Sequence, residues 1–478
     1  MPTHARASTR WDAAIVGSGP NGLAAALTLA RAGRAVKVYE AADTPGGAVR
    51  SGKATLAGYV HDLGAAVFPM AVDTPFFRGV PLKEYGLEFI FPEASVAHPL
   101  DDGTAAMLWR DPDRTASDLG PDAGRYSTLM RPVLGRWNEL VDDLFAPLHL
   151  PRHPVSFLSF GLRVCLPAAV LARAVFRTGR ARALLAGLAA HSILPLWHPM
   201  SAAFAVIMAA NGHLPGWPIV RGGAGGLSAA LASCLRSLGA EIETGREIKD
   251  LQDMEPSRAV FFDTAPEHAL RMAGRRLPPS YGRRLQAFRH GPGAFKVDWA
   301  LSGPIPWKAS CCREAATVHL GGSLAEIERS EGAVWRGERP EKPFVLLVQP
   351  SLFDASRAPA GRHTAWAYCH VPNGSAADMT GPIEAQVERF APGFKDLILA
   401  RSTMGPADLE RFDMNCMGGD IAGGANTITQ VFGRPVFSAN PYAMPAPGFY
   451  LCSASTPPGG GVHGLCGYHA ARAFLEEG

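Results

Sequence analysis

The chain has 478 residues, of which 47% are hydrophobic and 19% are charged, so it can bury a large core as two domains or one elaborated α/β unit. The formal net charge of +3 says little about partners, and the composition gives no sign of disorder. The eight cysteines show no C-x-x-C pair and no histidine at zinc spacing, which excludes a recognisable zinc site and favours buried thiols.

The first predicted unit is a strand, a turn, a helix and a second strand. Residues 12–17 (DAAIVG) are apolar, residues 21–32 have helical composition, and residues 35–40 (AVKVYE) form another buried-strand pattern. This order is typical of the βαβ opening of a parallel sheet. We predict no signal peptide ahead of it, because no apolar stretch or cleavage site precedes residue 12, and a cytoplasmic location is the default expectation.

The turn in this unit carries the pattern G-x-G-x-x-G between a strand and a helix. Glycines there let the backbone approach a pyrophosphate at the helix N-terminus, and a carboxylate at the end of the second strand can accept ribose hydroxyls. The glycine pattern, its place between a strand and a helix, and the acidic residue that follows together predict a dinucleotide site. Its predicted residues are Gly17, Gly19, Pro20, Asn21, Gly22 and Glu40.

A second glycine turn follows at Gly46 and Gly47, and Arg50 can bring a cation to the same pyrophosphate. With GYVHDLGAAVFP at 58–69, this region resembles the flavoprotein superfamily that includes monoamine oxidases, protoporphyrinogen oxidases and carotenoid (phytoene) desaturases. The resemblance runs nearly end to end. It implies non-covalently bound FAD as the cofactor.

The middle of the chain, residues 76–218, is rich in proline and has helical patterns around 160–190. Between Asp143 and Glu241 it holds eight arginines and no acidic residue. Two interpretations of 152–221 stay open: helices that line a tunnel for a lipid-like substrate and rest on an anionic membrane, or ordinary core with a solvated arginine face. Arginines interleaved with aliphatic residues give no stacking platform for nucleic acid. Residues 183–220 carry no charged side chain, but prolines interrupt them, and the longest stretch free of such breaks, 200–210, is too short for a membrane span.

An α/β pattern returns at residues 219–262. Residues 225–239 are predicted to be a helix, and strands are expected over 241–245, 247–251 and in RAVFFDTAP from Arg258. The segment 217–251 resembles the returning segment of the flavoprotein superfamily, in which a strand touches the adenine through its backbone. The resemblance places Ile248 near that adenine contact.

Residues 291–405 contain strand-like runs, the first of which, AFKVDWAL, holds Lys296. The resemblance to amine-oxidase-like flavoproteins implies that this lysine holds a water at flavin N5 and assists reoxidation. Two alternatives stay open, a strand-edge lysine that reaches solvent and an ion pair with Asp298 on the same strand face. In the later segment 415–435, Asp420 is interpreted mainly as the cap of a glycine-rich turn.

The stretch GFYLCSASTPPGGGVHGLCGYHAA, from residue 448, is close to the C-terminal pattern of phytoene-desaturase-like dehydrogenases. Ser453, Ser455 and Pro457 depart from the usual desaturase residues, which argues against carotene as the substrate and not against flavin binding. GGGVHG also satisfies G-x-G-x-x-G, but no strand with an acidic residue follows it. We expect it to hold the pyrimidine edge of the flavin at a helix N-terminus. The residues concerned are Gly460, Gly461, Val462, His463 and Gly464, and for His463 both a proton-transfer role and a merely tolerated histidine are considered.

The predicted fold is therefore α/β: a Rossmann-like FAD-binding domain with a parallel sheet from 11–75, 219–290 and 406–478, and an inserted mixed α+β substrate domain. The substrate domain is expected to comprise 76–218 and 291–405, with its helical part at 150–215 facing membrane or lipid.

The expected function is a phytoene dehydrogenase-like, FAD-dependent oxidoreductase that removes hydride from a lipid- or isoprenoid-like substrate and passes electrons to O2 or a quinone. Three alternatives stay open. One is a redox-neutral isomerase or saturase, another is an amine oxidase with Tyr442 or Trp299 in an aromatic cage, and the third is a non-catalytic FAD-bound scaffold.

Overall fold

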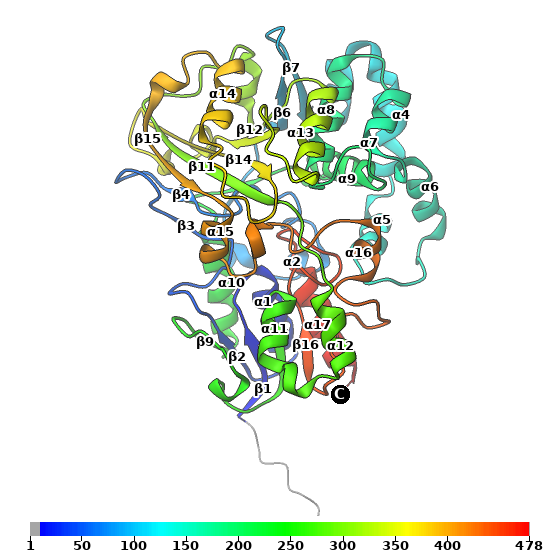
Figure 1. Cartoon of the computed structure of the whole chain (residues 1–478), viewed down its shortest axis with the longest axis vertical. Coiled ribbons are helices and arrows are strands. Elements are labelled where there is room, and N and C mark those ends of the chain that lie inside the picture. Colours follow the sequence, from blue (N-terminus) through cyan, green and yellow to red (C-terminus); the bar gives the residue numbers. More distant parts are fainter. Residues whose placement is uncertain (1–9, 478) are drawn as a thin grey trace, which may run out of the picture.

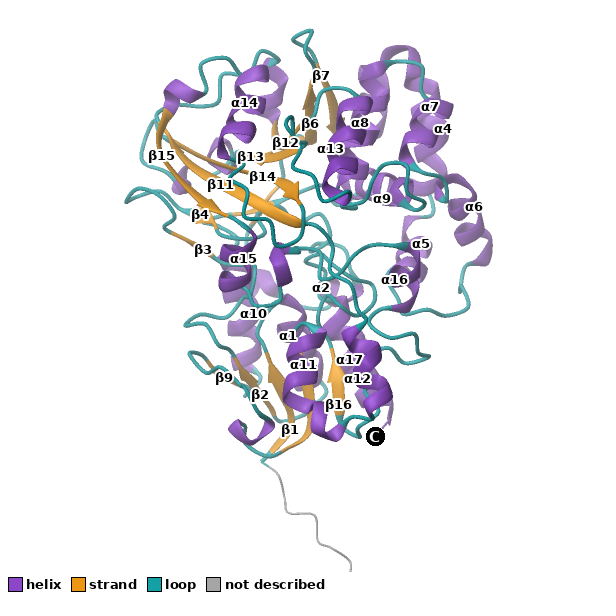
Figure 2. Ribbon diagram, in the orientation of Figure 1, coloured by secondary structure: helices purple, strands orange, loops and turns teal. Residues whose placement is uncertain are grey.

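The structure is a computed structural model that describes residues 10–477. Two large sheets organise the chain, a five-stranded sheet in the lower half of Figure 1 and a seven-stranded sheet in the upper half. Helices cover the lower sheet and gather on one side of the upper sheet, as Figure 2 shows. The expected α/β class is confirmed.

The five-stranded sheet is parallel throughout, in the order β16-β10-β1-β2-β9. Apolar side chains are buried on both of its faces, as parallel sheets require. Three segments distant in sequence supply it, which confirms the predicted three-segment sheet. Its strands are β1 (Trp11–Val16), β2 (Val36–Tyr39), β9 (Glu241–Glu243), β10 (Ser257–Phe262) and β16 (Phe449–Leu451).

The seven-stranded sheet is mixed, in the order β15-β11-β14-β13-β12-β6-β7. One face packs against α14 (Thr380–Phe390), and the other faces the helices of the middle segment and a large cavity. Its strands are β6 (Ala94–Pro99), β7 (Ala105–Trp109), β11 (Gly293–Leu301), β12 (Ala315–Leu320), β13 (Val345–Val348), β14 (His363–Val371) and β15 (Ile398–Met404). Two short pairs complete the strands, β3 (Ser51–Gly52) with β4 (His61–Asp62) and β5 (Phe89–Ile90) with β8 (Ile219–Val220).

The remaining helices divide between the two sheets. Around the parallel sheet lie α1 (Pro20–Arg31), α2 (Pro75–Arg78), α10 (Gly225–Ser237), α11 (Pro266–Ala273), α12 (Pro279–Gln286) and α17 (Leu465–Glu477). The helices of the middle segment are α3 (Pro112–Asp118), α4 (Ala123–Leu134), α5 (Trp137–Leu144), α6 (Pro154–Val164), α7 (Ala168–Val175), α8 (Gly179–Ala190) and α9 (Ser201–His213), and beside them or between the sheets lie α13 (Leu324–Trp335), α15 (Pro406–Phe412) and α16 (Ile428–Gly433). Across residues 10–477 no single helix is long and apolar enough to cross a membrane, and only the pair α6 and α7, bent by 86°, passes that test jointly.

One predicted strand is wrong. Residues 247–251 (EIKDL) form no strand, because the side chains of Asp250 and Asp253 bind nearby backbone N–H groups and close a 3-10 turn at Leu251–Asp253. Asp253 alone accepts hydrogen bonds from the N–H groups of Lys249 and Asp250. Local side-chain chemistry therefore overrides the apolar alternation.

Helices α1 and α17 join the two ends of the chain through a very close approach. A Cβ at Gly467 would lie 1.8 Å from the carbonyl oxygen of Asn21, which is backbone and cannot move aside alone.

We expect Gly467→Ala to lower the free energy of unfolding by about 3 kcal/mol, measured by urea denaturation. At Gly124 in α4 a Cβ would meet nothing within 4 Å, so Gly124→Ala is the matched control and should stay within about 1 kcal/mol of the parent. Equal effects of the two changes would contradict the close-approach argument.

Candidate functional site

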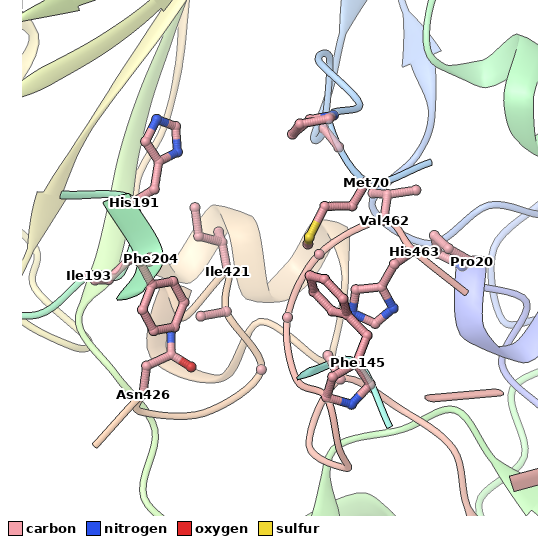
Figure 3. Close-up of a pocket in the computed structure, with 18 of the residues that line it drawn as sticks. Pro20, Met70, Phe145, His191, Ile193, Phe204, Ile421, Asn426, Val462 and His463 are labelled. Atoms are coloured by element: carbon pink, nitrogen blue, oxygen red, sulfur yellow. The ribbon is translucent and has the colours of Figure 1, made fainter. Parts of the chain in front are cut away.

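A cavity of ≈690 Å3 lies between the two large sheets. At one end it reaches Gly19, Pro20 and Asn21 at the start of α1, and it continues past the turn at 460–463. In Figure 3, Met70, Phe145, Val462 and His463 stand on one side of an open space, with His191, Ile193, Phe204 and Asn426 on the other. The two predicted glycine-rich turns from opposite ends of the chain therefore open on the same cavity.

The first glycine turn is built for close backbone contact. Gly17 has a φ of +97°, and a Cβ on Gly22 would lie 2.2 Å from the carbonyl oxygen of Gly17. Pro20 begins α1, and no side chain caps the helix at Gly19. These glycines leave the helix N-terminus open to the cavity, as a pyrophosphate site requires.

Glu40 stands at the end of β2 and is buried. Its carboxylate accepts hydrogen bonds from the Ser18 N–H (2.9 Å), the Ser18 hydroxyl (2.5 Å) and the Ala42 N–H (2.8 Å). It orders the glycine turn, since the N–H of Gly46 also donates to Ser18 O at 3.0 Å. Glu40 does not line the cavity itself.

The second glycine turn packs directly onto the first. A Cβ at Gly47, which has a φ of +54°, would lie 2.9 Å from the Cα of Gly19. Arg50 donates to the carbonyl oxygens of Gly47 (2.7 Å) and Phe412 (2.5 Å), and its guanidinium lies over the Phe412 ring. Arg50 thus ties this turn to the end of α15.

Asp263, which sequence reasoning did not select, lies against the glycines of the first glycine turn. Its Oδ2 accepts a hydrogen bond from the Gly22 N–H at 2.7 Å. Burial raises the pKa of Asp263 to about 7, and the charges of Asp413 and Glu40 add to that rise. Asp413 also lines the cavity, and burial raises its pKa. The site therefore holds two carboxyl groups whose pKa values lie above the usual range. The only signal in the sequence was an acidic residue directly after a buried strand.

The C-terminal turn lines the cavity through Gly460, Gly461, Val462 and His463. His463 is 1% exposed, its Nε2 donates to Gly459 O at 3.0 Å, and its Nδ1 accepts from the Leu465 N–H at 3.0 Å. Burial lowers the pKa of His463 to about 4. Because both ring nitrogens are engaged, the neutral imidazole holds the turn at the start of α17. Gly464 lies behind the turn, where a Cβ would meet the Phe76 ring.

Lys296 on β11 is buried, lines the cavity and is paired with Asp298 on the same strand face. The alternative of a lysine that reaches solvent is therefore wrong, and the ion pair is present. Burial raises the pKa of Asp298, but the nearby Lys296 and His61 outweigh it and leave the value below its usual range. His61 Nδ1 lies 3.5 Å from Asp298 Oδ1.

The other predicted positions lie around the site. Asp420 accepts hydrogen bonds from the N–H groups of Gly291, Ala422 and Gly424, each at 2.8 Å, which fits the turn-capping interpretation. Ile248 is buried in an apolar cluster under the parallel sheet, close in sequence to Arg246, whose N–H donates to Glu40 O at 2.8 Å. Ile248 does not line the cavity.

Arg434 is a further residue that the sequence did not reveal. It is 1% exposed and forms no ion pair within residues 10–477. Its guanidinium donates to Ala454 O (3.1 Å) and Asn426 Oδ1 (3.0 Å), and a Cβ on Gly459 would lie 2.5 Å from its Nη1. Burial lowers its pKa, yet a guanidinium keeps its charge, so a cation stands directly behind the C-terminal turn.

Comparisons with known proteins agree with this geometry. Residues 15–78 match a family described as an NAD(P)-binding Rossmann-like domain. Pyridine nucleotide-disulfide oxidoreductase domain-containing protein 2 of Mus musculus is 25% identical over 99% of this chain and 94% of its own length. A phytoene dehydrogenase of Streptomyces griseus is 27% identical over 85% of this chain and 80% of its own length.

Solved structures share the fold over nearly the whole chain. An oxidoreductase from Methanosarcina mazei has a TM-score of 0.62 at 15% identity and covers 97% of this chain and 99% of its own. Cyclohexylamine oxidase from Brevibacterium oxydans has a TM-score of 0.58 at 16% identity, and the match covers 98% of this chain and 99% of that one. The chain thus has a dinucleotide-binding Rossmann module within the fold of amine-oxidase-type oxidoreductases.

The titration of Asp263 gives a test of the pyrophosphate site. Above about pH 7 its carboxylate would ionise beside the bound phosphates, so FAD affinity should fall as pH rises through that value. Asp263→Asn keeps a carbonyl oxygen for the Gly22 N–H and removes the charge. We expect it to bind FAD about tenfold more tightly than the parent at about pH 9 and equally at about pH 6, measured by flavin fluorescence titration. Asp102→Asn, in the exposed β6–β7 turn, should keep the parent profile. An unchanged pH profile in Asp263→Asn would rule out this role.

Proposed function

We propose that the protein is a phytoene dehydrogenase-like, FAD-dependent oxidoreductase that removes hydride from a hydrophobic substrate and is reoxidised by O2 or a quinone. The observation that carries this proposal is the convergence of two glycine-rich turns, from the two ends of the chain, on one largely apolar cavity. The glycine spacing fits a dinucleotide, because a Cβ at Gly22, Gly47 or Gly460 would collide with backbone atoms.

When bound, FAD would supply the hydride acceptor. The start of α1 and the turn at Gly46 and Gly47 would hold its pyrophosphate, and Glu40 would keep the turn in place. The turn at 460–463 would hold the pyrimidine edge, where negative charge develops on reduction. Arg434, buried behind that turn, would stabilise this charge without touching solvent. His463 would hold this turn in place rather than transfer a proton, because both of its ring nitrogens already bind backbone groups.

Lys296 is proposed to hold a water at the flavin and assist reoxidation. Its side chain lies in the cavity wall, within 5.2 Å of the Trp366 ring centroid, and its charge is balanced by Asp298. A balanced ammonium can donate hydrogen bonds in an apolar wall without the full cost of an unpaired buried charge. This arrangement supports a redox role more than that of a proton-accepting base.

The alternatives differ in what supports them. An aromatic cage from Tyr442 and Trp299 finds no support, because Tyr442 binds Pro457 O through its hydroxyl and Trp299 binds Glu384, and neither lines the cavity. A redox-neutral isomerase would use the same site. A scaffold without catalysis would need no buried lysine in the cavity wall.

Reoxidation of the reduced flavoprotein tests the proposal without knowledge of the substrate. We expect the purified protein to retain FAD and, after anaerobic reduction with dithionite, to be reoxidised by O2 or a quinone in stopped-flow experiments. Lys296→Met combined with Asp298→Asn, which leaves no unpaired charge, should slow reoxidation by O2 at least about tenfold. The exposed Lys53→Met is the control. A protein without flavin, or one that neither acceptor reoxidises, would refute the oxidoreductase proposal.

We also propose that α6 and the loop before it contact a lipid membrane. Val155, Leu158 and Leu162 form one apolar row on α6 and are 63–71% exposed, while Leu150 is 91% exposed. Arg152 and Arg163 flank this row and form no ion pair within the described residues. The opposite side of α6 lines the cavity through Phe157, Phe160, Gly161 and Val164, so a lipid-soluble substrate would enter there.

Vesicle flotation tests this surface. The parent should float with vesicles of phosphatidylcholine and phosphatidylglycerol, and Leu158→Ser combined with Leu162→Ser should reduce the bound fraction at least about fivefold, because two buried leucines would be lost from the bilayer. Leu238→Ser and Leu399→Ser together change two other exposed leucines, 44% and 46% exposed, outside this surface and should have no effect. Equal flotation of both double variants would contradict the proposed surface.

A further inference from the structure

The cavity wall formed by the seven-stranded sheet carries polar groups without partners. Thr317 on β12 is 3% exposed and Trp366 on β14 is 6% exposed, and the Thr317 hydroxyl and the Trp366 indole N–H are buried with no hydrogen bond among the described residues. Tyr368 also lines this wall. Buried polar groups in proteins nearly always have a partner. Several unpaired groups on one cavity wall therefore point to a ligand that completes them.

Three histidines extend from this wall into the protein. His191 at the end of α8 lines the cavity, and its Nε2 lies 2.9 Å from Nε2 of His319 on β12. Nδ1 of His319 and Nδ1 of His98 face the same small space beside Gly187, where a Cβ would lie 2.8 Å and 3.0 Å from them. Because Gly187 has no side chain, the rings of His319 and His98 have room there. His98 is the last of the three histidines, and its Nε2 lies 2.8 Å from Gly322 O.

The histidines are joined at one contact, between Nε2 of His191 and Nε2 of His319. Nδ1 of His319 and Nδ1 of His98 are buried without a hydrogen bond among the described residues. His98 carries its proton on Nε2, because Gly322 O can only accept. Nδ1 of His191 likewise has no hydrogen bond among the described residues, and His191 lines the cavity. His191 thus presents an unpaired ring nitrogen to the cavity.

The charged groups of this wall are paired and its histidines are neutral. Burial lowers the pKa of His191 to about 3 and that of His98 to about 4, so both are neutral near pH 7. Lys296 is paired with Asp298, and behind Tyr368 the buried His370 Nδ1 binds Glu331 Oε2 at 2.7 Å. A carboxylate or ammonium ligand would find no free counter-charge here. Helix α9 adds apolar side chains to the cavity lining, namely Phe204, Ile207 and Met208.

We propose that His191, Thr317 and Tyr368 form a subsite for a neutral hydroxyl group on an otherwise apolar ligand. A hydroxyl both donates and accepts, so the ligand hydroxyl bonds to His191 Nδ1 and to the hydroxyl of Thr317 or Tyr368. His319 is a positioning residue that holds the His191 ring through the contact of their Nε2 atoms. The inference rests on the proposed function in that this ligand would share the cavity with the flavin, and it names the substrate class as an oxygenated lipid or isoprenoid rather than a hydrocarbon.

Equilibrium binding of four ten-carbon probes to the FAD-loaded protein tests this subsite. The probes are 1-decanol, decane, decanoate and decylammonium, and quenching of tryptophan fluorescence reports binding, because Trp217 and Trp366 line the cavity. A purely apolar cavity would bind decane far more tightly, since the hydroxyl must lose its water. We expect 1-decanol to bind at least as tightly as decane and about tenfold more tightly than either charged probe.

Variants separate the subsite from general packing. Thr317→Val and His191→Phe should each weaken 1-decanol binding about tenfold and leave decane affinity unchanged. His319→Phe, outside the cavity wall, should lower the alcohol-to-alkane affinity ratio in the same way. Thr364→Val is the matched control, because its hydroxyl is also buried and unpaired on the same sheet but does not line the cavity. It should bind both probes as the parent does.

Tighter binding of decane than of 1-decanol, tighter binding of a charged probe, or equal loss in Thr317→Val and Thr364→Val would overturn the subsite. Flavin content is measured first on the same samples. A protein that fails to bind FAD refutes the proposed function, whereas a flavoprotein without alcohol preference refutes this inference alone.

Discussion

The site depends on the close packing of the two ends of the chain. Helix α1 follows the first strand, α17 is the last described element, and they touch where Gly467 leaves no side chain between α17 and the Asn21 carbonyl. This contact sets the distance between the turn at Gly19 and the turn at Gly460, which face one cavity. Any side chain that separated the helices would move one end of the cofactor site relative to the other.

A second constraint is charge neutrality. The cavity wall contains ionisable groups, but each is paired, as Lys296 is with Asp298, or shifted toward its neutral form, as Asp263 and His191 are. Arg434, which lies outside the cavity wall and behind the C-terminal turn, is a buried cation whose partners are an amide and carbonyl oxygens. Its field falls on the turn at 460–463, where reduction of a flavin would add negative charge. The interior is thus arranged to stabilise the negative charge that a reduced flavin would gain beside the turn at 460–463.

The sequence predicted the parallel sheet, its three-segment origin and both glycine turns, because glycine spacing and apolar runs are local signals. It predicted the Lys296–Asp298 pair from strand alternation as one of several alternatives. It missed Asp263 and the histidine chain, because each depends on contacts between residues more than a hundred positions apart, such as His191 with His319. It missed Arg434 because nothing in the local sequence marks that arginine as buried. The strand predicted over 247–251 is wrong for a different reason. There, short-range hydrogen bonds of Asp250 and Asp253 outweigh an apolar pattern.

The position of β16 beside β10 also bears on how the protein is made. The glycine turn after β1 is synthesised early, yet its carboxylate partner Asp263 and the facing turn at 460–463 follow hundreds of residues later. A ribosome releases these parts in order, so the N-terminal turn must wait for the end of the chain before the cavity can close around a cofactor. Loading of the proposed FAD would therefore be a step of the finished polypeptide, and a truncated chain would expose the apolar faces of β10 and α1 to aggregation.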